Sequence, residues 1–232
     1  MNNSMRKIVV TGGASGLGGA VSASLSKRDD AVAVLDLNAP PAAVGATHYE
    51  AVDLADPRAA ERAVAAAAHQ LGGLDAVVTC AGIDACGSLA EVDAAHWDRV
   101  IAVNLIATAA VVRAALPWLP RDDGRIVTVA STLGLRALPA ATAYCASKFG
   151  VVGFSRALAA ETGGRPAVTC LIPGGMATPF FDGRPDQFRP PADAHLNDPM
   201  DVAQAVLFAL DQPAGCEVRE LIVCPTGEPS WP

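Results

Sequence analysis

A glycine-rich segment near the N-terminus constrains the fold of this chain more than any other feature. Residues 11–18 read TGGASGLG, and they follow a short β-branched run at 7–11 that suits a buried strand. Residues 16–28 then predict a helix. In this order of strand, turn and helix, backbone N–H groups and the helix dipole bind a pyrophosphate. The segment therefore predicts a parallel α/β sheet that binds a dinucleotide.

The glycines of this turn have separate predicted roles. Gly12 can adopt backbone angles that are closed to residues with a Cβ. Gly16 and Gly18 let the pyrophosphate and the helix backbone approach closely. The cofactor contacts predicted in this segment are Gly12, Ser15, Gly16, Leu17 and Gly18.

Strand-like and helix-like segments alternate along the whole chain. The predicted strands are 7–11, 31–36, 46–53, 75–80, 124–130, 167–172 and 219–224. The predicted helices are 16–28, 56–71, 93–117, 142–162 and 200–211. This alternation predicts a single Rossmann-type doubly wound domain over residues 1–232, with a seven-stranded parallel sheet and helices on both faces. The proline-rich segment 38–41 predicts a short or distorted connection in place of a full helix.

Composition excludes several classes of function. The formal net charge is −7 and there is no basic run, which argues against nucleic-acid binding. Residues 1–7 lack the apolar stretch of a signal peptide, and no apolar segment is expected to span a bilayer, so a cytoplasmic location with no membrane partner is the default expectation. None of the six cysteines has metal-site spacing, so we expect no metal.

A second pattern predicts chemistry. Tyr144 and Lys148 stand four residues apart on the predicted helix 142–162, so they share one face, and Ser131 lies upstream at the end of a predicted strand. An ammonium beside a phenol favours the phenolate and is expected to lower the pKa of Tyr144 below its usual value of about 10. Such a tyrosine can exchange protons near neutral pH. With the nucleotide-binding turn, this pattern indicates redox chemistry on a hydroxyl or carbonyl group.

In their order and spacing, these motifs resemble the short-chain dehydrogenase/reductase family along almost the whole chain. The matching residues are Asn104, Ser131, Tyr144 and Lys148 for catalysis, and Pro173, Gly174 and Thr178 for the segment that covers the nicotinamide. The resemblance implies reversible hydride transfer between a nicotinamide cofactor and a small secondary alcohol or ketone. Tyr144 would be the general acid/base, Lys148 would also bind the nicotinamide ribose, Ser131 would position the substrate oxygen, and Asn104 would hold a relay water.

The resemblance also implies cofactor contacts outside the glycine turn. These residues are Leu37, Asp53, Leu54, Cys80, Ala81, Gly82, Tyr144, Lys148, Pro173, Gly174, Met176 and Thr178. Cys80 departs from the family pattern, which has an asparagine at that position. A thiol is a weak hydrogen-bond partner, so we expect the loss of a side-chain contact that stabilises the sheet.

Asp36 bears on the choice between the two nicotinamide cofactors. A carboxylate at the end of the second strand accepts hydrogen bonds from the adenosine ribose and repels a 2′-phosphate. No Arg or Lys lies in the glycine turn or directly after Asp36, which favours NAD over NADP. The C-terminal segment 225–232 begins with Pro-Thr and lacks an Asp-Gly-Gly run, and it resembles a branch with many NADP-dependent carbonyl reductases. An NADPH-dependent carbonyl reductase therefore stays an alternative.

Residues 179–198 follow the nicotinamide-covering motif, and analogy with the family makes them a short substrate lid. Phe180, Phe181 and Met176 could line an apolar pocket or serve ordinary packing. Arg184 and Arg189 are interpreted as solvated loop charges, in preference to receptors for an anionic substrate. The predicted helix 142–162 is apolar around most of its circumference, which predicts a homodimer or homotetramer that buries its outer face.

Two other classes of function compete with this interpretation. A non-catalytic dinucleotide-binding regulator or scaffold is the main alternative, although it would have no need of all four catalytic residues. A serine hydrolase is disfavoured because Ser15 has Leu17 where a nucleophile elbow requires a second glycine.

Overall fold

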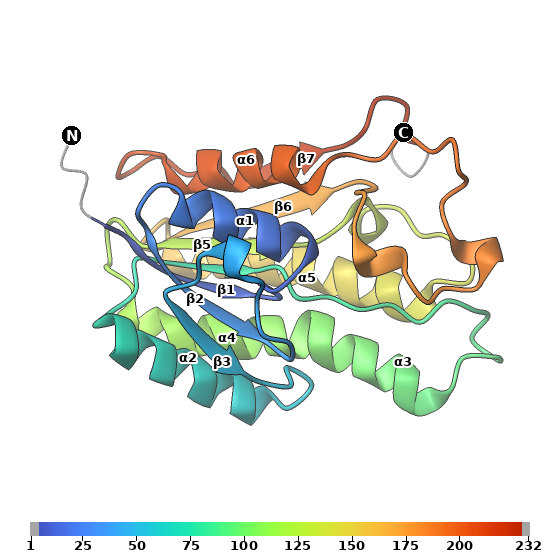
Figure 1. Cartoon of the computed structure of the whole chain (residues 1–232), viewed down its shortest axis with the longest axis horizontal. Helices are drawn as coiled ribbons and strands as arrows, with labels where there is room; N and C mark the ends of the chain where they lie inside the picture. Colours follow the sequence, from blue (N-terminus) through green and yellow to red (C-terminus); the bar gives the residue numbers. More distant parts are fainter. Residues whose placement is uncertain (1–4, 229–232) are drawn as a thin grey trace.

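Seven parallel strands form the centre of the protein, in the order β3-β2-β1-β4-β5-β6-β7 (Figure 1). The computed structural model describes residues 5–228, so residues 1–4 and 229–232 of the expected domain lie outside it. The strands are β1 (Lys7–Thr11), β2 (Ala31–Asp36), β3 (His48–Ala51), β4 (Ala76–Thr79), β5 (Arg125–Val129), β6 (Ala167–Pro173) and β7 (Glu220–Val223). The predicted fold class is confirmed, and every predicted strand is present.

Helices cover both faces of this sheet (Figure 1). The α-helices are α1 (Gly16–Ser26), α2 (Pro57–Leu71), α3 (Ala94–Ile101), α4 (Ala107–Ala115), α5 (Thr142–Thr162) and α6 (Pro199–Leu210). One apolar cluster lies between the sheet and the pair α1 and α6, and the other lies under α2, α4 and α5. Because both faces are covered, the central strands are almost continuously apolar, as expected for a parallel sheet.

Two helices begin in the same way, for a reason that can be read from the sequence. In α2 the carboxylate of Asp56 caps the backbone N–H groups of the first turn, and Pro57 occupies the first helical position. Asp198 and Pro199 repeat this arrangement at α6. An acidic cap satisfies free N–H groups and complements the helix dipole, and proline needs no N–H bond there.

The order of the strands reverses between β1 and β4, and this is the switch point at which such sheets bind ligands. Val10 of β1 pairs with Val78 of β4, so the segments after both strands begin side by side. A Cβ on Gly12 would lie 2.7 Å from the Cα of Ala81, so only glycine allows this approach. The carboxyl edge of the sheet therefore brings together the glycine turn and the segment after β4.

The predicted helix 93–117 is the main departure from expectation. It is divided into α3, a π-helical turn at Ala102–Ile106, α4 and a final 3-10 turn at Leu116–Trp118. Single π-helical turns within α-helices occur often at functional sites, and Asn104 lies in this one. The connection after β2 contains only a 3-10 turn at Ala42–Val44, which confirms the predicted short connection.

The same helical run, Ala94–Trp118, has the length and apolar composition of a membrane span. This differs from the expectation that no apolar segment would be long enough to span a bilayer. Half of its most apolar stretch is buried inside the fold, where Val111 and Ala115 pack in the cluster shared with α2. A buried core helix meets the same criteria. Packing within the domain therefore accounts for the apolar character of this run.

Candidate active site

The glycine turn has the geometry that a dinucleotide needs. A Cβ on Gly18 would lie 2.1 Å from the carbonyl oxygen of Gly12, so no larger residue fits where the turn enters α1. Ser15 is the N-cap of α1, yet its side chain accepts no hydrogen bond from the first turn of that helix. The N–H groups of this turn can therefore bind an anion, and Leu17 anchors the helix in the core below.

Asp36 lies where a ribose-binding carboxylate is expected. Its Oδ2 accepts a hydrogen bond from the N–H of Ala14 at 3.0 Å, and its Oδ1 accepts one from the N–H of Asn38 at 3.0 Å. These bonds hold the carboxylate between the glycine turn and the segment after β2. Leu37 follows with its side chain exposed. The residues present fit an adenosine ribose at this position.

The segment after β6 closes over the glycine turn from the opposite side. Pro173 ends β6, and a Cβ on Gly16 would lie 3.6 Å from the Cβ of Thr178. Met176 forms a parallel bridge with Asn197 at the far end of the lid. The structure thus brings these predicted residues to the same edge of the sheet as the glycine turn.

Sequence reasoning missed one partner of this segment. The carboxylate of Glu228 accepts a hydrogen bond from the N–H of Gly175 at 2.8 Å, and a Cβ on Gly174 would lie 2.5 Å from the same carboxylate. The C-terminal segment therefore supports the motif that was expected to cover the nicotinamide. No local pattern marks this contact, because it joins residues 53 positions apart.

Asp53 has a partner that was not expected. Both of its carboxylate oxygens lie 3.0 Å from Nη2 of Arg99 on α3, and Oδ1 accepts a hydrogen bond from the N–H of Ala55 at 2.9 Å. The bond from Ala55 and the charge of Arg99 hold the pKa of Asp53 below its usual range. Leu54 is buried in the core. The predicted cofactor contact of these two residues stays a prediction.

Cys80 behaves as an apolar residue at the end of β4. Its side chain packs against the cluster under α1 and α6, and burial raises the pKa of the thiol to about 12. The neighbouring backbone is held instead by the N–H of Ala81, which donates to Oγ1 of Thr11 at 3.3 Å. A Cβ on Gly82 would lie 3.6 Å from Nζ of Lys148, so this segment runs past that lysine.

Ser131, Tyr144 and Lys148 come together above the ends of β5 and α5. Tyr144 lies in the first turn of α5, and its hydroxyl is hydrogen bonded to the side chain of Ser131. Nζ of Lys148 lies 5.6 Å from the centre of the Tyr144 ring and donates to the carbonyl oxygen of Val129 at 2.9 Å. Burial lowers the pKa of Lys148 to about 8.

The expected lowering of the tyrosine pKa is wrong for this structure. Burial raises the pKa of Tyr144 to about 12, against a smaller lowering from its hydrogen bond with Ser131. The reason is geometric, because Lys148 directs its ammonium to a backbone carbonyl and lies beside the phenol ring. In the free protein Tyr144 therefore keeps its proton at neutral pH.

Asn104 makes contacts that the sequence did not indicate. Its amide accepts a hydrogen bond from the N–H of Ile83 at 2.8 Å and donates to the carbonyl oxygen of Ile83 at 2.9 Å. It also donates to Oγ of Ser147 at 3.0 Å, and that hydroxyl donates to the carbonyl oxygen of Tyr144 at 2.8 Å. Asn104 thus ties the segment after β4 to α5, and its predicted role toward a water stays a prediction.

The lid carries the clearest correction. Arg184 was expected to be a solvated charge, but its Nη2 lies 2.7 Å from Oδ2 of Asp84 in a buried ion pair. Its guanidinium also lies over the rings of Phe180 and Phe181, and the Phe180 ring is centred 5.5 Å from that of Tyr144. Arg189 is exposed, as expected. The lid therefore rests directly on Tyr144.

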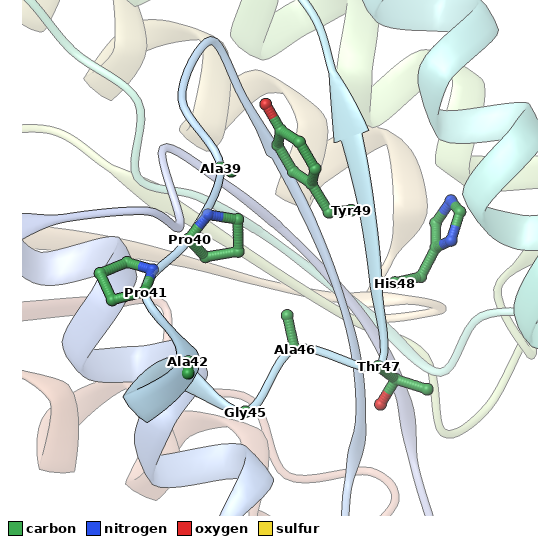
Figure 2. Close-up of a pocket in the computed structure, with 9 residues that line it drawn as sticks. All are labelled: Ala39, Pro40, Pro41, Ala42, Gly45, Ala46, Thr47, His48 and Tyr49. Atoms are coloured by element: carbon green, nitrogen blue, oxygen red, sulfur yellow. The ribbon is translucent and has the colours of Figure 1, made fainter.

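Two surface hollows lie on the part of the chain that the structure describes. One, of about 410 Å³, is formed by the proline-rich connection and the start of β3, and Figure 2 shows Tyr49 on its wall. It contains none of the predicted site residues. The other, of about 670 Å³, is lined by the lid and includes Thr178. Within the part of the chain that the structure describes, no group of three or more His, Cys, Asp or Glu side chains could hold a metal ion.

The chain is similar to known proteins over most of its length. A sequence model of the family described as short chain dehydrogenase matches residues 6–187. The chain is 37% identical over 188 residues to a 2-dehydro-3-deoxy-L-rhamnonate dehydrogenase (NAD(+)) of Sphingomonas sp., which covers 78% of this chain and 76% of that protein. It is 32% identical over 237 residues to glycine betaine reductase ATRR of Emericella nidulans, which covers 95% of this chain but 19% of that protein.

A solved structure agrees with these sequence comparisons. A short chain dehydrogenase from Burkholderia cenocepacia in complex with NADP aligns with a TM-score of 0.81 at 28% identity. The alignment covers 94% of this chain and 96% of that one. The likeness therefore extends over most of the fold.

Proposed function

The chain belongs to the short-chain dehydrogenase/reductase family, and we propose that it transfers a hydride between NAD and a small secondary alcohol or ketone. The observation that carries this proposal is the convergence of Ser131, Tyr144 and Lys148 at the edge of the sheet that also holds the glycine turn. A cofactor bound at the glycine turn and the hydroxyl of Tyr144 would then both reach a substrate in one site.

The cofactor would be held by backbone and carboxylate groups. The N–H groups at the start of α1 would bind the pyrophosphate, Asp36 the adenosine ribose, and the segment Pro173 to Thr178 the nicotinamide end. A bound nicotinamide dinucleotide supplies or accepts the hydride. The protein contributes position and charge around it.

Tyr144 would move the proton. Because the free protein holds Tyr144 in its protonated form, its hydroxyl can donate to a carbonyl oxygen in the reduction direction. In the oxidation direction the same oxygen takes the proton of the alcohol, so we expect that rate to rise with pH. Ser131 would hold the substrate oxygen, and Lys148 would place positive charge beside the phenol ring.

The preference for NAD rests on Asp36. Its carboxylate is fixed by two backbone N–H groups, and a 2′-phosphate brought beside it would meet an unscreened negative charge. The NAD(+) named for the Sphingomonas relative agrees with this choice, whereas the Burkholderia structure holds NADP. An NADPH-dependent reductase with the same catalytic residues is therefore the second candidate.

The first experiment is a fluorescence titration of the purified protein with NADH and, in parallel, with NADPH. We expect NADH to bind at least about tenfold more tightly, because Asp36 favours a free ribose and repels a phosphate. Tighter binding of NADPH would favour the NADPH-dependent reductase over the NAD-dependent enzyme. Binding of neither cofactor would contradict both.

The second experiment separates an enzyme from a non-catalytic binding protein. Secondary alcohols are screened with NAD, and the best substrate is used to compare the wild type with Tyr144→Phe. We expect the substitution to reduce turnover by about 10²- to 10⁴-fold and to leave NADH binding within twofold, since it removes only the proton-transferring hydroxyl. Tyr49→Phe is the matched control, because these are the two tyrosines of the chain. Equal turnover in Tyr144→Phe would remove Tyr144 from the mechanism.

We also propose that the protein is a homo-oligomer through the outer face of α5. Phe149 on this helix and Ile106 beside it are exposed by 45% and 46%, and a Cβ on Gly153 would meet nothing within 4 Å. A partner helix could pack closely on this flat, apolar face. Light scattering at micromolar concentration tests this, and a monomeric mass would contradict it.

A further inference from the structure

Arg184 and Asp84 join the lid to the segment after β4 through a buried ion pair. Nη2 of Arg184 is 2.7 Å from Oδ2 of Asp84, and the two side chains are exposed by only 16% and 8%. Removal of one partner would leave the other charge buried without compensation, which is strongly unfavourable. The pair therefore ties the lid to the body of the protein.

Asp84 stands on a rigid support. The preceding residue, Ile83, has its N–H and its carbonyl oxygen both bonded to the side chain of Asn104. Three residues after Asp84, the N–H of Gly87 donates to the carbonyl oxygen of Ala140, just before α5 begins. The carboxylate of Asp84 is thus fixed relative to α5. The ion pair therefore holds the lid, through Arg184, against a fixed point of the domain.

On the lid side, the contact continues to the catalytic tyrosine. The guanidinium of Arg184 lies 4.7 Å from the centre of the Phe180 ring and 4.6 Å from that of Phe181. The Phe180 ring in turn is centred 5.5 Å from the Tyr144 ring. Stacking of this kind transmits the position of Arg184 to Phe180 and from Phe180 to Tyr144.

We propose that Asp84 and Arg184 are positioning residues whose ion pair latches the lid and holds Phe180 against Tyr144. This assignment rests on the proposed function, since it places the pair in the service of the reaction at Tyr144 without contact with the reacting atoms. Asp84 is not among the predicted site residues, and Arg184 lies in the predicted lid, where it was interpreted as a solvated loop charge.

The charges of the pair also act on Tyr144. The ionisable groups that face Tyr144 are Lys148 and Cys145 on α5, Asp84 after β4 and Arg184 on the lid, beside the hydroxyl of Ser131. Burial is the largest cause of the raised pKa of Tyr144, Asp84 raises that pKa further, and Arg184 lowers it. Opening the lid would hydrate the phenol and lower the pKa of Tyr144. Loss of Asp84 adds to this lowering, whereas loss of Arg184 opposes it.

The latch can be tested without any turnover. The lid contains Phe180, Phe181 and Phe188, at which chymotrypsin cuts, and mass spectrometry identifies the bonds cleaved in the full-length protein. We expect Asp84→Asn and Arg184→Met each to raise the initial rate of cutting in the lid by about tenfold or more, because each breaks a buried pair. The double variant should show less than the product of the two effects.

Asp186→Asn is the matched control for proteolysis. Its partner Arg189 also lies in the lid, but their ion pair is exposed and long, at 3.3 Å, so we expect no change in the rate of cutting. Unchanged cutting in both Asp84→Asn and Arg184→Met would overturn the latch. Equal acceleration in Asp186→Asn would also overturn it, because any charge change would then loosen the lid.

The pH dependence of alcohol oxidation tests the effect on Tyr144. Here the rate falls as pH drops through the pKa of Tyr144, so a lower pKa moves this acid limb to lower pH. We expect a shift of at least about half a pH unit in Asp84→Asn and a smaller one in Arg184→Met. If proteolysis of the lid is faster in both variants but their pH–rate profiles do not shift, the ion pair tethers the lid without positioning Tyr144. That result would overturn the proposal. Absence of wild-type turnover would instead contradict the proposed function, while proteolysis still decides the latch.

Discussion

The cofactor end and the lid meet at the same edge of the sheet, but they are built from different kinds of contact. At the cofactor end, backbone groups fix the geometry, as in the bond from the N–H of Gly12 to the carbonyl oxygen of Leu35 at 2.9 Å. The lid contains only two short 3-10 turns, Pro179–Phe181 and Asp186–Phe188. Backbone bonds from Asn197 to Gly175 and Ala177 hold its C-terminal end, but the rest of its position depends on side chains, above all on Arg184 and its partner 100 residues away.

This difference separates two properties of the protein. Backbone contacts at the cofactor end require glycine at particular positions and tolerate little else. The side-chain contacts of the lid can be replaced without disturbing the sheet. A fold of this kind can therefore change what it acts on while it keeps the way in which it binds a dinucleotide. The following substitutions test that separation, from the largest expected effect to the smallest.

Gly18→Ala should have the largest effect, because the new Cβ would lie 2.1 Å from the carbonyl oxygen of Gly12. We expect a loss of about 3 kcal/mol or more in the free energy of unfolding, measured in urea, and no detectable NADH binding. Gly19→Ala is the control, since its Cβ would meet its neighbours at 3.5 Å or more. A stable Gly18→Ala protein that binds NADH would contradict the tight fit of the turn.

Asp36→Ala should act mainly on cofactor choice. Loss of the carboxylate removes the hydrogen bonds to the ribose and the repulsion of a 2′-phosphate, so we expect the ratio of NADH to NADPH affinity to fall about 10- to 100-fold. Parallel titrations measure this ratio. Asp186→Ala removes an exposed lid carboxylate and should leave the ratio unchanged. An unchanged ratio in Asp36→Ala would show that another group selects the cofactor.

Phe180→Ala should affect the lid without affecting cofactor binding. It removes the ring that lies between Arg184 and Tyr144, so we expect kcat/KM for the alcohol to fall about tenfold. The dissociation constant for NADH should stay within twofold. Phe208→Ala on α6 removes an exposed ring of the same size and serves as the control. A parallel loss of NADH affinity in Phe180→Ala would mean that lid and cofactor end are coupled.

Lys148→Met should have the smallest effect, and it tests whether Lys148 is buried between the cofactor end and the lid. The pKa of Lys148 is lowered to about 8, so above that pH this side chain binds more protons in the unfolded chain than in the folded one, and its contribution to the free energy of unfolding rises with pH. Cysteines such as Cys80, whose pKa burial raises to about 12, make a contribution of the opposite sign in both proteins. We therefore expect the change in the free energy of unfolding between pH 8 and 9 to be about 1 kcal/mol more positive in the wild type than in Lys148→Met. This window lies below the onset of Tyr144 titration. Equal slopes in both proteins would contradict the burial of a titrating lysine.

Much of the cofactor end could be predicted from the sequence because it depends on local patterns. The strand before Gly12, the glycine spacing and the carboxylate of Asp36 at a strand end are all local features, and the structure places them at the switch point of the sheet. The bounds of α5 were also predicted as the structure has them, because Tyr144 and Lys148 lie on a long apolar run that ends at Gly163.

The electrostatic state of the site could not be predicted in the same way. The spacing of Tyr144 and Lys148 correctly places both on one helix, but it led to the wrong direction for the tyrosine pKa. That direction depends on burial and on where the ammonium points, and Lys148 points at the carbonyl oxygen of Val129 on another element. A motif specifies which groups are near, whereas the surrounding packing specifies their solvation.

The strands, the dinucleotide turn and the identity of the residues beside it could thus be predicted from the sequence alone, because each follows from patterns within a few positions of the chain. Only the tertiary structure decided that Arg184 is buried against Asp84, that Asn104 holds Ile83, and that Phe180 covers Tyr144. These contacts join elements far apart in the sequence. Their geometry depends on how the whole sheet and its covering segments pack, so local sequence patterns do not predict it.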